Sequence, residues 1–172
     1  MKRTDPAVFV GLAAFAIAGS AHGHVVFTQP TAVAGSHWAG ALRVGHGCDG
    51  FATTSVRVEI PPSIAVVRAR VPAGWTVVVE RQALAEPLPA EGGGLLTERV
   101  SAITWKGRLP DDQFEEFGLA GKLPATAGTL IFPITQTCEQ GVLHWKDAVV
   151  PNQPRPAHPA AALKVEAGAH DH

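Results

Sequence analysis

Residues 54–60 read TSVRVEI, and this stretch shows the clearest structural pattern in the 172-residue chain. Its apolar side chains, Val56, Val58 and Ile60, alternate with polar ones, so the two kinds fall on opposite faces of an extended segment. Such alternation is typical of an antiparallel strand with one buried and one exposed face. Pro61 ends the pattern because proline has no N–H for a sheet ladder. The stretch therefore predicts an antiparallel β protein.

Similar short segments lie on both sides of this strand, separated by turns that contain glycine or proline. We expect strands at residues 24–28, 37–44, 66–71, 75–80, 98–105, 129–138 and 141–145, a loop at residues 87–94, and a turn or a short extended stretch at the acidic residues 111–117. The chain has 18 glycines and 14 prolines, and no helical period follows residue 23. We predict a single all-β domain, an antiparallel β-sandwich of the immunoglobulin-like or cupredoxin-like kind.

The first residues have the features of a secretory signal peptide. A short basic segment precedes an apolar run at residues 7–18, which is too short to span a bilayer as a helix. Small residues follow, and cuts after Gly23 or after Ala21 both satisfy the small-residue rule for signal cleavage. We expect residues 1–23 to be removed and the mature chain to be periplasmic or secreted rather than embedded in a membrane. An uncleaved anchor is the alternative.

The charge balance argues against a nucleic-acid partner. Removal of residues 1–23 takes away Lys2, Arg3 and Asp5, so 14 basic and 15 acidic residues become 12 and 14, a net charge of about −2 with neutral histidines. No dense cluster of lysine and arginine occurs in the sequence. The composition does not exclude a small ligand.

The two cysteines, Cys48 and Cys138, are far apart in the sequence. An even number of cysteines in an exported chain most simply indicates one disulfide. The alternative is that both are thiolate ligands of copper or zinc, although no Cys-x-x-Cys spacing supports it.

Signal cleavage would create a metal chelate at the new N-terminus. A cut after Gly23 leaves His24 as the first residue, with an α-amine and an imidazole that can bind one ion together. These nitrogen donors suit Cu(II), which stands at the top of the divalent affinity order. A cut after Ala21 leaves His24 in third position, where it can wrap a square-planar Cu(II) or Ni(II) with the amine and two backbone nitrogens. The alternative is that these histidines are spacers near a cleavage site.

A series of short motifs runs through the chain in a fixed order. They are Ala21-His22-Gly23-His24, Gln29-Pro30, Ala34-Gly35-Ser36, His46-Gly47-Cys48-Asp49-Gly50, Ile60-Pro61, Pro72-Ala73-Gly74-Trp75, Ile103-Thr104-Trp105, Gln113-Phe114 with Phe117, and Gln136-Thr137-Cys138 with Trp145. In these motifs, over about residues 21–159, the chain resembles the YcnI-like copper-binding family.

The resemblance implies an extracytoplasmic β-sandwich that binds one Cu(II) per mature chain through an N-terminal histidine, in an arrangement called a monohistidine brace. It favours the cut before His24 and a role in copper homeostasis. Trp145 matches a tryptophan that lies beside the metal in the family. A family glutamate two residues after a Gly-Ser pair is absent, because His37 and Trp38 follow Ser36 here. The resemblance therefore leaves the remaining ligands open.

Several residues are candidates for this vacancy. The first candidate is His46, which stands in a glycine-rich loop beside Cys48. His37 and Asp49 are the candidates ranked after it. His144 alternates with Trp145, so the two cannot face the same side of one strand.

The chain beyond the expected domain, residues 24–159, is proline-rich and then small and polar. We expect residues 160–172 to form a flexible tail. Its histidines, His170 and His172, form with His158 a candidate secondary metal site.

The leading hypothesis is a copper-binding protein, not an enzyme, that sequesters Cu(II) or delivers it to a membrane copper transporter or another copper chaperone. One alternative is a copper redox enzyme with an N-terminal histidine, which would need a second histidine such as His37, His46 or His144. Another is a metal-free β-sandwich used for adhesion or partner binding. No Ser-His-Asp set, phosphate loop or cysteine nucleophile stands out in the sequence.

Overall fold

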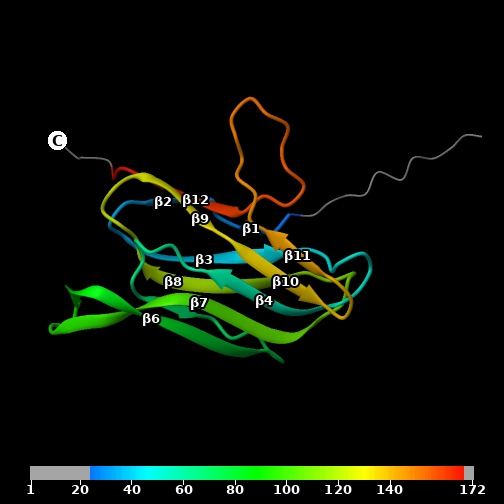
Figure 1. Cartoon of the computed structure of the whole chain (residues 1–172), viewed down its shortest axis with the longest axis horizontal. Helices are drawn as coiled ribbons and strands as arrows, with labels where there is room; N and C mark the ends of the chain where they lie inside the picture. The colour runs from blue at the N-terminus through cyan, green and yellow to red at the C-terminus, as the bar shows by residue number, and fades with distance from the viewer. Residues whose placement is uncertain (1–23, 169–172) are drawn as a thin grey trace, which may run out of the picture.

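The computed structural model describes residues 24–168, and within that range the secondary structure consists of strands (Figure 1). The strands are β1 (Val26–Phe27), β2 (Thr31–Val33), β3 (His37–Val44), β4 (Thr53–Glu59), β5 (Val67–Ala69), β6 (Thr76–Pro89), β7 (Leu95–Leu109), β8 (Glu115–Lys122), β9 (Gly128–Phe132), β10 (Ile134–Cys138), β11 (Val142–Trp145) and β12 (Ala161–Glu166). The expected signal peptide and the two last histidines, His170 and His172, lie outside the described residues. Residues 24–168 contain no helix that could cross a membrane.

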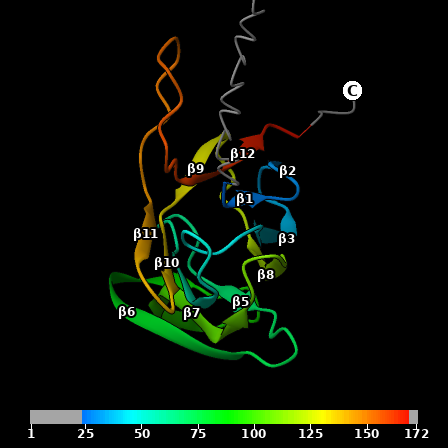
Figure 2. The ribbon, with the colours of Figure 1, turned by 90° about the vertical axis from the view of Figure 1, so that its right-hand side faces the viewer.

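Two antiparallel sheets form the layers of a β-sandwich (Figure 2). One has the strand order β1-β3-β8-β5, and the other has the order β11-β10-β4-β7-β6. A third sheet, β2-β12-β9, extends the sandwich at one side, and in it β12 runs antiparallel to β9 and parallel to β2. The predicted all-β sandwich is therefore confirmed.

Strand β4 shows why the alternating stretch specifies this architecture. Val56 and Val58 are fully buried, whereas Arg57 on the other face forms ion pairs with Glu59 and Glu80. β4 lies inside its sheet between β10 and β7, so both of its edges are hydrogen-bonded to neighbours. An apolar face on a central strand thus becomes one wall of the core.

Aromatic side chains join the layers across the core. The ring centre of Phe117 in β8 lies 5.2 Å from that of Trp105 in β7 and 4.9 Å from that of Trp75. The rings of Phe27 in β1 and Phe132 in β9 lie 4.9 Å apart, edge to face, and join the third sheet to the first. Trp38, Trp75 and Trp105 are all buried in the core.

The segment expected as one strand at residues 129–138 is two strands in different sheets. Pro133 separates β9 from β10, because it has no N–H to continue a ladder and the chain changes sheet there. β10 then pairs with β11 as an antiparallel hairpin, with Ile134 opposite Trp145. The strand expected at residues 129–138 was correct in type and wrong in continuity.

Two further segments are more extended than the sequence predicted. β6 continues through the first residues of the expected loop and ends at Pro89, and β7 begins at Leu95. The acidic segment leads into β8, which pairs with β3 over the whole length of β3. In both segments, pairing with a neighbouring strand produces a strand where the local composition predicted a loop or a turn.

The flexible tail expected from residue 160 is wrong for residues 161–166, which form β12. Ala161, Leu163 and Val165 are buried in the core, while Ala162 and the other intervening side chains are exposed. The domain therefore extends past residue 159. Between β11 and β12 the chain leaves the sandwich as a projecting loop (Figure 1).

Candidate metal centre around Trp145

Trp145 is the last residue of β11, and its side chain is 1% exposed. Strand alternation turns its neighbour His144 outward, where the hydroxyl oxygen of Thr135 lies 3.4 Å from His144 Nδ1. The two residues therefore face opposite sides, as the sequence predicted, and only Trp145 belongs to the interior.

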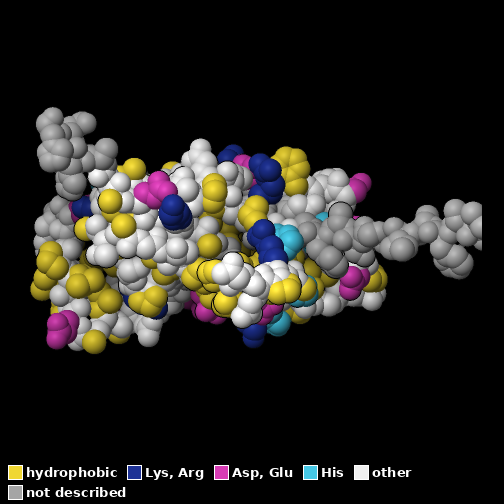
Figure 3. Space-filling view, turned by 90° about the horizontal axis from the view of Figure 1, so that it is seen from above, with side chains coloured by type: hydrophobic (Ala, Val, Ile, Leu, Met, Phe, Trp, Pro, Cys, Tyr) yellow, Lys and Arg dark blue, Asp and Glu magenta, His cyan; other side chains and the backbone are white. Residues whose placement is uncertain are grey.

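Three histidine rings surround this indole, and they come from three separate segments. The ring centre of His24, just before β1, lies 6.2 Å from the Trp145 ring centre. His46, in the loop after β3, lies at 6.2 Å, and His158, in the segment before β12, lies at 5.0 Å. Histidine side chains gather around the base of the projecting loop when the molecule is seen from above (Figure 3). The structure thus brings together His24, His46 and Trp145, which the sequence proposed, and adds His158.

His24 is held by the strand that follows it. Val25 and Phe27 are buried, and Val26 pairs with Arg43 at the end of β3 that leads to the His46 loop. The His24 side chain is half-buried. An amine formed by cleavage before His24 would therefore lie at the start of an ordered strand.

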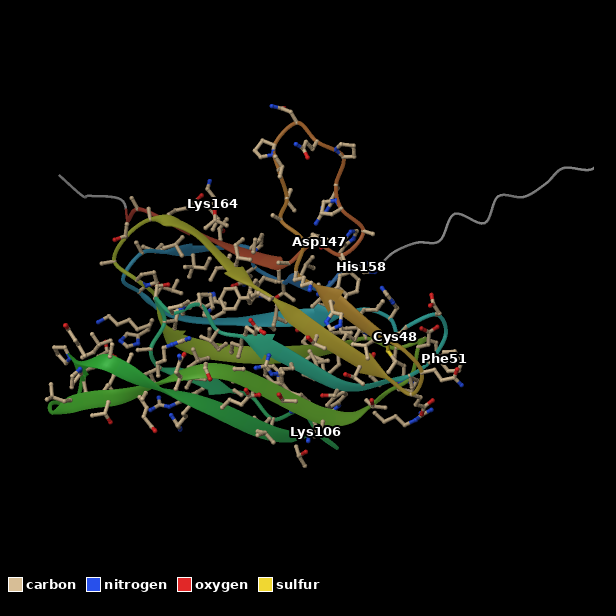
Figure 4. All side chains as sticks on the ribbon, viewed as in Figure 1. Cys48, Phe51, Lys106, Asp147, His158 and Lys164 are labelled. Carbon is tan, nitrogen blue, oxygen red and sulfur yellow. A yellow bond between two sulfur atoms is a disulfide. The ribbon has the colours of Figure 1, made fainter. Side chains whose placement is uncertain are left out.

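The loop that carries His46 is fixed on several sides. Cys48 forms the predicted disulfide with Cys138, and Cys48 and Phe51 exchange main-chain hydrogen bonds of 3.1 and 2.9 Å (Figure 4). The N–H of Gly47 donates to Asp111 Oδ1 at 2.9 Å. A Cβ at Gly47 would lie 1.9 Å from the Phe51 carbonyl oxygen, so glycine is required there. The thiolate-ligand alternative for the cysteines is excluded by the disulfide.

Gln136 in β10 links this loop to the indole. Its side chain is fully buried, and its Nε2 donates to the His46 carbonyl oxygen and to Thr53 Oγ1, each at 2.8 Å. Its Oε1 accepts from Trp145 Nε1 at 3.0 Å. All strong polar atoms of this amide are therefore used, in one orientation, because the indole only donates and the carbonyl only accepts. The sequence motif at residues 136–138 marked this residue without giving its role.

The ring of His46 is oriented by its neighbour. Its Nδ1 lies within hydrogen-bonding distance of the Gly47 carbonyl oxygen. Because a carbonyl oxygen only accepts, Nδ1 carries the proton, and the lone pair of the neutral ring lies on Nε2. Carbonyl acceptors of this kind fix the tautomer of metal-binding histidines. The contact with Gly47 therefore orients the His46 ring through Nδ1.

Of the other candidates, His37 lies at the start of β3 and Asp49 in the turn after Cys48. His37 begins β3, about 24 Å from its far end at a rise of about 3.4 Å per residue, and its Nε2 lies 3.6 Å from Glu91 Oε1. The Lys122 ammonium, 2.6 Å from the same oxygen, lowers the pKa of the Glu91 carboxyl. Asp49 is an exposed turn residue with a φ of 50°. The structure therefore does not bring His37, a candidate ligand ranked after His46, to the end of β3 that pairs with β1.

The donors around Trp145 do not form a multidentate set of side chains. Among residues 24–168, no group of three or more histidine, cysteine, aspartate or glutamate side chains is arranged to hold one metal ion. A metal centre at this place would therefore depend on main-chain donors, foremost the amine that cleavage before His24 would create and the amide nitrogens near it, together with an imidazole. Nitrogen donors of this kind suit Cu(II), so the residues present fit that ion.

The fold and this arrangement define an immunoglobulin-like β-sandwich with a histidine-rimmed tryptophan at one side. The chain belongs to the family described as domain of unknown function DUF1775, whose model matches residues 24–165. YcnI belongs to the same family, so the resemblance seen in the sequence is confirmed at the level of the family.

One solved structure is similar over most of both chains. It is the crystal structure of an uncharacterized protein from Nocardia farcinica, described as revealing an immunoglobulin-like fold. The two share 28% sequence identity with a TM-score of 0.66, and the match covers 83% of this chain and 97% of that one. No curated protein matches the chain.

Proposed function

We propose that the mature chain is an extracytoplasmic Cu(II)-binding protein that sequesters copper or delivers it to a membrane transporter or another chaperone. Copper binds at His24, through the imidazole and the α-amine that signal cleavage creates, beside the indole of Trp145. One Cu(II) is bound per chain. The observation that carries this proposal is the convergence of His24 and two further imidazoles on one buried tryptophan.

The amine distinguishes this site from an ordinary surface histidine. An α-amine has an ordinary pKa of about 7.7 to 8.0, so copper displaces its proton at little cost near neutral pH. Amine and imidazole on one residue then form a chelate without requiring a second side chain. The chelate could therefore bind copper although the described residues contain no group of three or more metal-binding side chains arranged around one ion.

The surrounding groups give the site its order. The disulfide, Asp111 and Gln136 hold the His46 loop against the indole, and the buried face of β1 holds His24. His46, whose ring centre lies 6.2 Å from that of Trp145, is a candidate for a further nitrogen ligand. Groups that do not bind the metal themselves raise metal affinity when they hold the ligands in a fixed orientation.

The proposal is tested by copper titration of the exported and processed protein. His24→Ala, and separately acetylation of the α-amine, should each weaken Cu(II) binding by about tenfold or more. His144→Ala is the matched control, because it removes an imidazole on the outer face of the strand that holds Trp145. Unchanged affinity in both N-terminal variants would refute the proposal.

The same protein separates a binding function from a redox enzyme. With Cu(II) and a reductant present, a copper oxidase or monooxygenase would consume oxygen in the presence of its substrate. We expect consumption no faster than that of the His24→Ala variant with the same copper. Faster, substrate-dependent consumption would assign the site to an enzyme.

A further inference from the structure

The segment between β11 and β12 is a loop closed at its base by main-chain hydrogen bonds. The N–H groups of Lys146 and Asp147 both donate to the carbonyl oxygen of His158 at 3.1 Å, and that of Ala160 donates to Asp147 at 3.0 Å. Asp147 and Pro159 also form a parallel bridge. Asp147 and His158 therefore lie side by side where the projecting loop leaves the sandwich (Figure 4).

This closure fixes the position of His158 without using its side chain. Pro159 is buried and leads directly into β12, whose buried residues anchor the segment in the core. The half-buried His158 ring lies edge-on to Trp145, with the planes at 71° and the centres 5.0 Å apart. Of the three histidine rings around the indole, it is the closest.

Packing against Trp145 does not explain why residue 158 is a histidine rather than an apolar residue. Within residues 24–168, no hydrogen bond or ion pair to a ring nitrogen of His158 is present, whereas its carbonyl oxygen accepts two. An apolar residue would fill the same edge-on place against the indole at lower desolvation cost. A nitrogen donor in this position instead suits a copper ion bound at His24, whose ring contacts the same indole.

We infer that His158 is a ligand of the same copper ion as His24 and takes the place of the carboxylate that this chain lacks. The inference rests on the proposed function. Since the three imidazoles are not arranged around one ion in the structure described, the His158 ring turns about its side-chain bonds to reach the metal. Its carbonyl hydrogen bonds stay in place during that turn, so the loop remains closed.

Pulsed electron paramagnetic resonance of the Cu(II) protein tests this, because it counts the imidazoles bound to the ion. The wild-type count should be two or more. His158→Ala should lower the count by one and weaken Cu(II) affinity by about tenfold or more, while His144→Ala changes neither. A wild-type count of one, or the same count and affinity in His158→Ala, would overturn the inference.

Two additional measurements keep the outcomes separate. The apo form of His158→Ala should unfold at nearly the wild-type temperature, since the closing hydrogen bonds use main-chain atoms. If that variant does not fold, His158→Gln takes its place and should lower the imidazole count by one in the same way. If His24→Ala leaves affinity and count unchanged, the proposed function fails. If His24→Ala weakens binding and His158→Ala does not, only the role of His158 fails.

Discussion

The indole N–H of Trp145 donates to the side-chain oxygen of Gln136 over 3.0 Å, in a part of the core where both side chains are almost completely buried. The same amide donates to the His46 carbonyl oxygen. One side chain therefore sets the relative positions of the tryptophan and of a histidine loop that is 90 residues away in the sequence.

Gln136→Met should destabilise the protein and weaken its copper site together. The substitution keeps the volume but leaves the Trp145 N–H and the His46 carbonyl oxygen without this partner. Each buried unsatisfied group costs about 1–3 kcal/mol, so we expect a loss of about 2–4 kcal/mol in urea unfolding of the apo protein. Gln140→Met, at an exposed turn position, is the control and should cost less than about 0.5 kcal/mol. Equal stabilities of the two variants would contradict this role.

Gly47→Ala should disrupt the His46 loop, whereas Gly45→Ala should not. A methyl group at position 47 would meet the Phe51 carbonyl oxygen at 1.9 Å, but at position 45 it meets nothing within 4 Å. We expect Gly47→Ala to cost about 1–3 kcal/mol in thermal unfolding, through the backbone shift that the clash requires. The two changes flank His46, so a larger effect of Gly45→Ala would show that the loop is held differently.

Replacement of both cysteines, Cys48→Ala with Cys138→Ala, should lower stability substantially. The bridge joins residues 90 positions apart, and its loss is expected to cost about 4 kcal/mol, within the usual range for native disulfides. Copper affinity of the folded fraction should fall as well, because the bridge fixes the His46 loop. Both cysteines are replaced so that no free thiol binds copper. A stability within about 1 kcal/mol of the wild type would contradict this account.

The ion pair between Arg57 and Glu80 predicts a small, pH-dependent contribution to stability. Hydrogen bonds from Arg57 are the main cause that lowers the pKa of the Glu80 carboxyl. A lowered folded-state pKa means that the contribution is complete above the unfolded value of about 4.3 and is lost as pH falls through the folded value. Because both side chains are partly exposed, Glu80→Gln should cost about 0.2–1 kcal/mol at neutral pH.

Unfolding of the wild type and Glu80→Gln in urea, from about pH 6 to about pH 2, measures this difference. The gap between the two should close at the acid end. Glu86→Gln on the same strand provides the control, since Glu86 makes no ion pair among the residues that the structure describes. A gap that widens with acid would contradict the assignment of the effect to Glu80.

The sequence predicted those elements whose burial pattern is local. The alternation around Val56 identified β4, and the apolar face of residues 37–44 identified β3. β12 also alternates, with Leu163 and Val165 inward, but the small residues around it obscured the pattern. β8 was missed in part because its stability comes from pairing along β3 rather than from its own composition.

The sequence predicted those residues of the candidate site that belong to short motifs. His24, His46 and Trp145 were identified from their motifs, and in the structure the rings of both histidines contact the indole of Trp145. His37 was a candidate ranked after His46, yet its position in the sequence does not show which end of β3 pairs with β1. His158 was grouped with His170 and His172 as a secondary site, because only the pairing of β12 with β9 and β2 brings it back to the sandwich.

The central claim is that export creates a copper chelate at His24. Native mass measurement of the protein recovered from outside the cytoplasm, with and without Cu(II), tests it most directly, because one spectrum reports both the cleavage point and the stoichiometry. The account predicts a chain that begins at His24 and gains one copper ion, and a His24→Ala chain that does not retain it under the same conditions. A chain that keeps residues 1–23, or a wild-type chain that binds no copper, would contradict the account.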